Sequence, residues 1–154
     1  MGRFHFFRLI RLAPVLLACA TASLMAARAI DARDEISGPV SATVVRVIDG
    51  DTFVAEAHVW PGETVRVSVR IRGIDAPELH SRCRRERFAA AEARDALAAL
   101  LDRPPVKITN IGGGKYYGRV LADVETEDGE VAPALLSRAL VRLYSGSRRQ
   151  SYCG

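Results

Sequence analysis

A run of alternating side chains leads into a turn that carries two carboxylates, and this pattern constrains the fold more than any other feature of the chain. From Thr64 to Gly73, valine and isoleucine occupy every second position, with arginine or serine between them. A period of two predicts a strand with one buried and one polar face. Pro77 disfavours a helical conformation at Ala76. The strand is therefore expected to end in a turn that holds Asp75 and Glu78.

Further strands are predicted on both sides of this one. The two that precede it run from Thr43 to Ile48 and from Thr52 to Val59. They are separated by the segment Asp49 to Asp51, in which the Asp-Gly pair tolerates the positive φ of a tight hairpin turn. The two that follow it run from Val106 to Asn110 and from Arg119 to Glu125.

Two helices complete the pattern. A period of 3.6 from Arg84 to Leu101 predicts one long helix, whose apolar stripe consists of Ala89, Ala93, Leu97, Leu100 and Leu101. A short helix is predicted from Val131 to Ala139, since Pro133 is tolerated in a first turn. The predicted fold is therefore α+β and mainly β: a five-stranded OB-type barrel with one long helix and a short C-terminal helix.

The first 29 residues have the three parts of a secretory signal peptide. Arginines lie within Met1 to Arg11, an apolar run extends from Leu12 to Ala27, and small residues predict cleavage after Ala29. Two alternatives stay open. The segment Leu16 to Cys19 resembles a bacterial lipobox, which would lipidate Cys19, and an uncleaved leader would act as an anchor. We expect a periplasmic or secreted bacterial protein, bound to a membrane only in those two cases.

The net charge of the chain comes from its leader, and the remainder is long enough for a single domain. The leader carries four of the 22 basic residues and none of the 18 acidic ones, which leaves 18 of each in the remainder. The net charge of +4 is therefore no indication of a polyanionic partner. Residues 1–29 are predicted as a signal peptide, residues 30–41 as a polar linker, and residues 42–154 as one domain.

Three short motifs supply the side chains that a hard cation and a phosphodiester require. They are the segment Ile48 to Thr52, Arg70 together with Asp75 to Glu78, and the segment Tyr117 to Arg119. Carboxylates suit an oxygen-ligated cation such as Ca²⁺. Guanidinium groups bind phosphate oxygens through two parallel hydrogen bonds. Closure of the sheet would bring the early turns together.

In their order and approximate spacing around one long helix, the motifs resemble those of the staphylococcal nuclease family. The resemblance extends from about Ala42 to Tyr144. It implies that Asp51 and Asp75 bind Ca²⁺ directly and that the backbone carbonyl of Ala76 is a third oxygen ligand.

The same resemblance implies the catalytic roles. Glu78 would be the general base or would position the attacking water. Arg70 and Arg119 would stabilise the charge that develops on the phosphate. Tyr117 would stack on or hydrogen-bond the nucleotide. Tyr144 would cap the pocket or, equally, fill a corner of the core.

These assignments imply an exported, Ca²⁺-dependent endonuclease that hydrolyses DNA and RNA with little sequence preference and leaves 3′-phosphate products. DNA and RNA are then its partners, as substrates, and no stable protein partner is expected. The alternative is a catalytically inactive nucleic-acid- or protein-binding module of the same family. Such modules usually lack one of the motif acids or arginines, whereas this chain has Asp51, Arg70, Asp75, Glu78 and Arg119.

The cysteines indicate an oxidising compartment. Cys19 is lost with the leader or lipidated, so that Cys83 and Cys153 remain as an even pair. We predict a disulfide between them that ties down the tail from Ser145 to Gly154, because this tail has no apolar pattern. Two unrelated thiols are the alternative.

His80 and Cys83 form only half of a zinc-binding pattern, and no second half follows.

Overall fold

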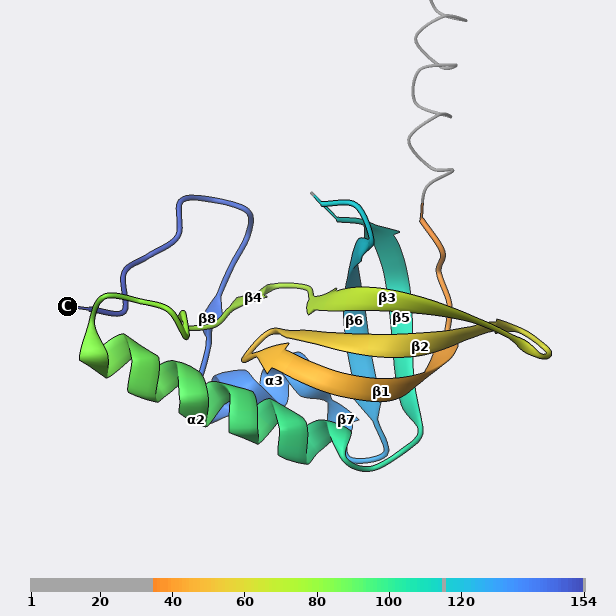
Figure 1. The fold of residues 1–154 in the computed structure, drawn as a ribbon, viewed down its shortest axis with the longest axis horizontal. Coiled ribbons are helices and arrows are strands. Elements are labelled where there is room, and N and C mark those ends of the chain that lie inside the picture. The colour runs from red at the N-terminus through yellow and green to blue at the C-terminus, as the bar shows by residue number, and fades with distance from the viewer. Residues whose placement is uncertain (1–34, 115, 154) are drawn as a thin grey trace, which may run out of the picture. The chain divides into compact units, whose positions relative to one another are not determined.

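The computed structural model describes residues 35–114 and 116–153, which form a barrel of strands with two helices (Figure 1). The long strands are β1 (Val40–Asp49), β2 (Thr52–Trp60), β3 (Glu63–Ile71), β5 (Val106–Gly113) and β6 (Arg119–Thr126). Short strands are β4 (Ile74–Asp75), β7 (Gly129–Glu130) and β8 (Arg142–Leu143), and the helices are α2 (Arg84–Leu101) and α3 (Val131–Ser137).

The predicted leader, including Cys19, lies outside the described residues. Among the residues that are described, no helix combines the length and apolar character needed to cross a membrane.

Five strands close into a barrel. They follow the order β3-β2-β1-β5-β6 with antiparallel neighbours, and β3 also pairs with β6 in the parallel direction. In this last pairing Ser68 lies opposite Arg119 and Arg70 lies opposite Leu121. Because alternate residues of a strand share a face, Arg119 lies on the same face as Ser68 and Arg70. The predicted α+β barrel of OB type, with one long and one short helix, is confirmed.

The hydrophobic core lies inside the barrel and beneath α2. Phe53, Ile71 and Leu97 are among its largest fully buried side chains. Helix α2 has the predicted bounds, but its apolar stripe differs from the prediction. The buried residues are Glu86, Ala90, Ala93, Leu97 and Leu101, whereas Ala89 and Leu100 are half-buried. The buried face follows every third or fourth residue around Ala93 and Leu97, and at the helix start it includes Ala90 in place of Ala89.

Strand boundaries differ from the predictions at the glycine-rich segment. Strand β5 continues to Gly113, beyond its predicted end at Asn110, because Gly112 and Gly113 pair with Leu121 and Val120 of β6. On the amino-terminal side, Ile36 forms an isolated antiparallel bridge with Ile111. Part of the segment predicted as a linker therefore contacts the sheet, and the division into leader, linker and domain stays a prediction.

The turn between β1 and β2 presses against the long helix. The predicted hairpin is present, but Gly50 does not have the positive φ on which the prediction relied. A Cβ atom at Gly50 would lie 2.6 Å from the Cβ of Ala93 and 2.9 Å from the Cβ of Ala76. Only glycine fits at position 50, because any Cβ atom there would overlap its neighbours. Its absence of a side chain lets the hairpin turn approach both α2 and the acidic turn after β4.

Candidate active site

Arg70 joins the two acidic turns. It lies near the end of β3, opposite Thr52 of β2. Its Nη1 donates to Asp51 Oδ1 at 2.7 Å and its Nη2 donates to Asp75 Oδ1 at 3.3 Å. The side chain of Asp51 is 3% exposed and that of Arg70 is 25% exposed. The barrel thus brings together three residues that the sequence assigned to one site.

Both carboxylate oxygens of Asp51 are hydrogen-bonded. Oδ1 also accepts from the Thr52 hydroxyl at 2.7 Å, and Oδ2 accepts from the backbone N–H of Ala76 at 2.8 Å. Burial raises the pKa of Asp51 to about 7, although the Arg70 guanidinium opposes this effect. Asp49 accepts from the backbone N–H of Asp51 at 3.1 Å and so shapes the turn. The contact with Ala76 ties the hairpin turn directly to the acidic turn.

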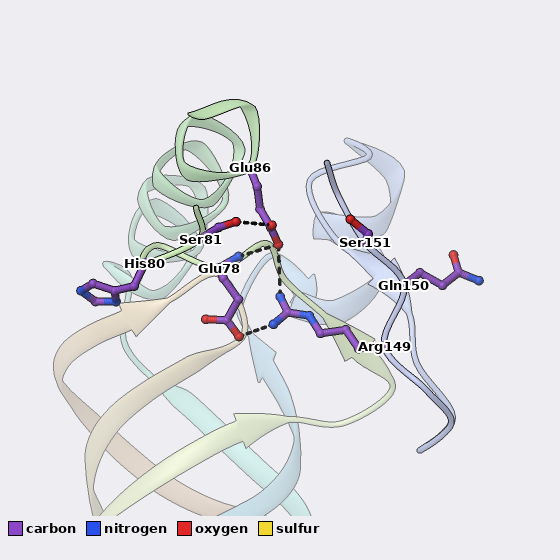
Figure 2. A pocket seen from close by; sticks show the side chains of 7 residues that line it. All are labelled: Glu78, His80, Ser81, Glu86, Arg149, Gln150 and Ser151. Carbon is purple, nitrogen blue, oxygen red and sulfur yellow. Dashed lines mark hydrogen bonds and ion pairs between the residues drawn. The ribbon is translucent and has the colours of Figure 1, made fainter. Parts of the chain in front are cut away.

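A residue that the sequence analysis missed contacts the same acidic turn. The guanidinium of Arg149 donates from Nε to Asp75 Oδ2 at 2.9 Å, from Nη1 to Glu78 Oε1, and from Nη2 to the carbonyl oxygen of Ala76. Figure 2 shows Arg149 reaching from the C-terminal segment towards Glu78 and Glu86. No sequence signal identified it, since it stands in a tail without periodicity. Arg149 therefore touches three residues predicted to bind metal or to act in catalysis.

Glu86, in the first turn of α2, holds the loop that carries Glu78. Its Oε2 accepts from the Ser81 hydroxyl at 2.6 Å, and its Oε1 accepts from the backbone N–H of Glu78 at 3.2 Å. These bonds, the Ser81 bond above all, lower the pKa of Glu86 against the effect of burial. Beside Glu86 lies a cavity of about 460 Å³ lined by the seven residues labelled in Figure 2. The sequence analysis did not single out Glu86, which is a buried carboxylate that holds the Glu78 loop through these two bonds.

The side chain of Arg119 lies apart from this cluster. Although Arg119 shares a barrel face with Arg70, its guanidinium lies over the ring of Tyr116, 5.1 Å from the ring centroid. Within residues 35–114 and 116–153, Arg119 forms no ion pair with Asp51, Asp75 or Glu78. The structure thus assembles the predicted acids with Arg70 but not with Arg119.

The two predicted substrate-binding tyrosines differ in their surroundings. Tyr117 is fully exposed beside Arg119. Tyr144 is half-buried, donates its backbone N–H to the carbonyl oxygen of Gly73 at 2.8 Å, and lines a small cavity together with Asp75. Tyr144 therefore lies next to the acidic turn, and its role stays a prediction.

Cys83 and Cys153 both lie beside Ser81: the Cys83 backbone N–H donates to the Ser81 hydroxyl at 3.3 Å, and the Cys153 thiol lies 3.8 Å from the same oxygen. Both cysteines are free in this structure, and the interaction between their thiols lowers the pKa of Cys83 and raises that of Cys153. The Cys153 thiol also donates to Glu86 Oε2 at 3.2 Å. The C-terminal tail therefore brings Cys153 to the start of α2, as the predicted disulfide requires. The pairing itself stays a prediction.

The oxygen donors of the acidic turn fit a hard cation. In the part of the chain that the structure describes, no three His, Cys, Asp or Glu side chains gather as a metal site, so a cation would depend on few carboxylates and a carbonyl. Asp75 Oδ2, the Ala76 carbonyl oxygen and Glu78 Oε1 converge on the positive guanidinium of Arg149. Three oxygens that converge on one positive group form a donor set of the chemical kind that suits Ca²⁺.

The structure defines the class of protein: a small OB-type domain with a polar site at one end of its barrel. The site contains paired carboxylates, the arginine that bridges them and an adjacent glutamate. The family model for staphylococcal nuclease homologues matches residues 68–152, more than half of the chain. The chain belongs to this family. No curated protein sequence matches it. The matched segment includes Arg70, Asp75, Glu78, Arg119 and Arg149 but not Asp51, whose place in the site depends on its contact with Arg70.

Proposed function

We propose that the protein is a Ca²⁺-dependent nuclease that hydrolyses phosphodiester bonds of DNA and RNA with little sequence preference. Its family relationship makes it a relative of known nucleases. The observation that carries the proposal is the bridge from Arg70 to Asp51 and Asp75, next to Glu78. This arrangement supports the proposal because it would unite cation ligands, a phosphate-binding group and a carboxylate that acts on water.

In the proposed mechanism, Asp51, Asp75 and the Ala76 carbonyl would hold Ca²⁺. When bound, the ion would neutralise negative charge on the scissile phosphate. Arg70 would bind a phosphate oxygen from the end of β3, and its contacts with two carboxylates keep its guanidinium oriented before substrate arrives. Preorganised donors of this kind stabilise a transition state without reorganising during the reaction.

Glu78 would act on the attacking water, either as a general base or by positioning it. Its backbone is held by Glu86, which limits the movement of the loop. Water would attack phosphorus in line, and by analogy with the family the products would carry 3′-phosphates. Arg119 would rotate from the ring of Tyr116 to the phosphate, since its backbone already lies on the face that carries Arg70.

A second candidate is a binding module without catalysis. One observation favours it: Arg149 occupies the oxygens of Asp75, Ala76 and Glu78 that the reaction would use. If this contact persisted in the presence of Ca²⁺ and substrate, these oxygens would not be available for the reaction, and any nucleic acid that bound would not be cleaved.

Cleavage of a short labelled oligonucleotide by the purified protein distinguishes the two functions. The nuclease requires product in Ca²⁺, none in excess chelator, and none with Glu78→Gln. The binding module would retain the oligonucleotide in all three conditions without product. Absence of both cleavage and binding would reject both functions.

We further propose that the protein acts outside the cytoplasm, in the periplasm or after secretion, as the leader sequence predicts. Fractionation of cells that express the full chain, combined with the mass of the mature protein, tests this. Cleavage after Ala29, lipidation at Cys19 and retention of the leader each give a different mass.

A further inference from the structure

The C-terminal tail crosses the acidic turn and is held there by polar contacts. The Tyr152 hydroxyl donates to the carbonyl oxygen of Asp75 at 2.6 Å. Arg142 lies over the Tyr152 ring, 4.0 Å from its centroid, and donates to the carbonyl oxygen of Ser151 at 3.0 Å. In Figure 1 the tail loops out from β8 and returns to the start of α2. These contacts keep Arg149 over the site.

Arg149 takes the oxygens that the proposed Ca²⁺ site requires. Nε donates to Asp75 Oδ2 at 2.9 Å, and Nη2 donates to the Ala76 carbonyl oxygen. Ca²⁺ binds oxygen at about 2.3–2.6 Å. A guanidinium that donates to these two oxygens takes up lone pairs that an ion would use, and it places a positive charge beside the ion. Contact of Arg149 with the turn therefore opposes Ca²⁺ binding there.

We propose that Arg149 is an internal cation that competes with Ca²⁺ for Asp75 and Ala76 and withholds Glu78 from water until the tail is released. This inference rests on the proposed metal site. When the tail lies over the acidic turn, Arg149 neutralises the carboxylates of that turn. When the tail is released, the turn binds Ca²⁺. The tail therefore acts as an autoinhibitory strap.

Competition has a thermodynamic consequence. The apparent dissociation constant for Ca²⁺ equals the intrinsic one divided by the fraction of molecules with a released tail. Linkage requires the reverse as well, so Ca²⁺ binding must raise the population with a released tail by the same factor. Both effects disappear when Arg149 loses its guanidinium.

The neighbouring arginine provides a matched control. Arg148 is exposed and forms no ion pair within the described part of the chain, 35–114 and 116–153. Arg148→Ala therefore removes the same charge, one position away, without removing the contacts with the acidic turn. Arg149→Lys keeps the charge but removes the planar fork that reaches several oxygens at once.

Calorimetric titration with Ca²⁺ tests the proposal in the purified protein. We expect Arg149→Ala to bind Ca²⁺ about tenfold or more tightly than the parent, which corresponds to a population of released tail of about one in ten or less. Arg149→Lys should fall between them, and Arg148→Ala should stay within about twofold of the parent, as expected for a screened surface charge. Equal affinities for Arg149→Ala and Arg148→Ala, or weaker binding by Arg149→Ala, would reject the competition.

Amide hydrogen exchange in residues 146–152 gives a second readout. In the parent, exchange should accelerate when Ca²⁺ is added, whereas in Arg149→Ala it should be fast with and without the ion. If the parent cleaves oligonucleotide with Ca²⁺ but shows neither difference, the proposed function stands and the autoinhibitory strap is rejected. If Ca²⁺ binds to none of the variants and none cleaves, both the proposed function and the competition are wrong.

Discussion

Arg70 donates to Asp51 at 2.7 Å and so joins the end of β3 to the hairpin turn between β1 and β2. Asp51 is almost completely buried, while a quarter of the Arg70 side chain remains exposed. In the proposed function the exposed part of this side chain would meet a phosphate, and the buried contact with Asp51 keeps the guanidinium oriented. The ion pair between Arg70 and Asp51 is therefore expected to affect both the stability of the protein and its turnover.

Arg70→Ala should reduce both turnover and stability. Removing one transition-state donor lowers turnover by about a hundredfold to a thousandfold. The buried carboxylate of Asp51 also loses its partner, which costs about 3 kcal/mol, at the lower end of the range for a buried ion pair. Oligonucleotide cleavage at saturating Ca²⁺ and urea unfolding measure the two effects. The double variant Arg70→Ala with Asp51→Asn should recover most of the stability and none of the activity; failure to recover stability would contradict this account.

Arg119→Ala should reduce turnover by a similar factor of about a hundred to a thousand but leave stability within about 0.5 kcal/mol, since its guanidinium lies on the ring of Tyr116 at the surface. Arg66→Ala is the control, because Arg66 lies on the exposed part of β3 and pairs with Glu56. Turnover of Arg119→Ala within a few-fold of the Arg66→Ala value would remove Arg119 from the catalytic assignment.

Asp51→Ala and Asp75→Ala should act through the cation. With only two direct carboxylates, the parent is expected to bind Ca²⁺ with a dissociation constant of about 0.1–1 mM, as extracellular calcium sites do. Both variants should show no measurable binding by calorimetry. Asp95→Ala is the control, since Asp95 is exposed on α2 and pairs only with Arg94 among the described residues. Unchanged Ca²⁺ binding in either site variant would show that the cation binds at another place in the protein.

Oxidation should join Cys83 and Cys153, which both lie beside the Ser81 hydroxyl at the start of α2. The two cysteines are 70 positions apart, and a loop of this length contributes about 4 kcal/mol on the chain-entropy model. Intact mass of protein exposed to oxidised glutathione, measured with and without a reductant, gives the answer. Reduction should add the mass of two hydrogens, and Cys83→Ser should abolish that difference. Labelling of both cysteines in the oxidised sample would show that the pair does not form.

Gly50→Ala should displace the hairpin turn from the helix. The new methyl group would overlap the Cβ atoms of Ala93 and Ala76, and overpacking of this kind costs about 1–3 kcal/mol. Urea unfolding should show the loss. Addition of Ala93→Gly should restore part of the lost stability by removing one of the two overlaps, after allowance for the cost of Ala93→Gly alone. A neutral effect of Gly50→Ala would mean that the turn can move away from α2 without strain.

Periodicity predicted the elements of this fold well, because the barrel strands and α2 have regular buried faces. The short motifs and the family resemblance, not periodicity, pointed to Asp51, Asp75 and Glu78, and the structure joins Asp51 to Asp75 through Arg70. Periodicity did not identify Arg149 or Tyr152, since a tail held by hydrogen bonds and ring contacts has no repeating pattern. Glu86 was missed for a different reason. A charged residue on a helix is normally exposed, and only its bonds with Ser81 and Glu78 explain its burial.

The parallel pairing of β3 with β6 also makes the site depend on a contact between distant parts of the chain. The hairpins β1-β2 and β2-β3 join segments that are close in the chain, whereas Ser68 and Arg119 are separated by the whole of α2 and β5. Contacts across long loops are formed late, because closing the loop costs entropy before the contact compensates for it. Arg70 and Arg119 therefore share a face only in the finished barrel. A nascent or partly unfolded chain cannot present both arginines to a phosphate, so nuclease chemistry on this scaffold would begin only after folding is complete.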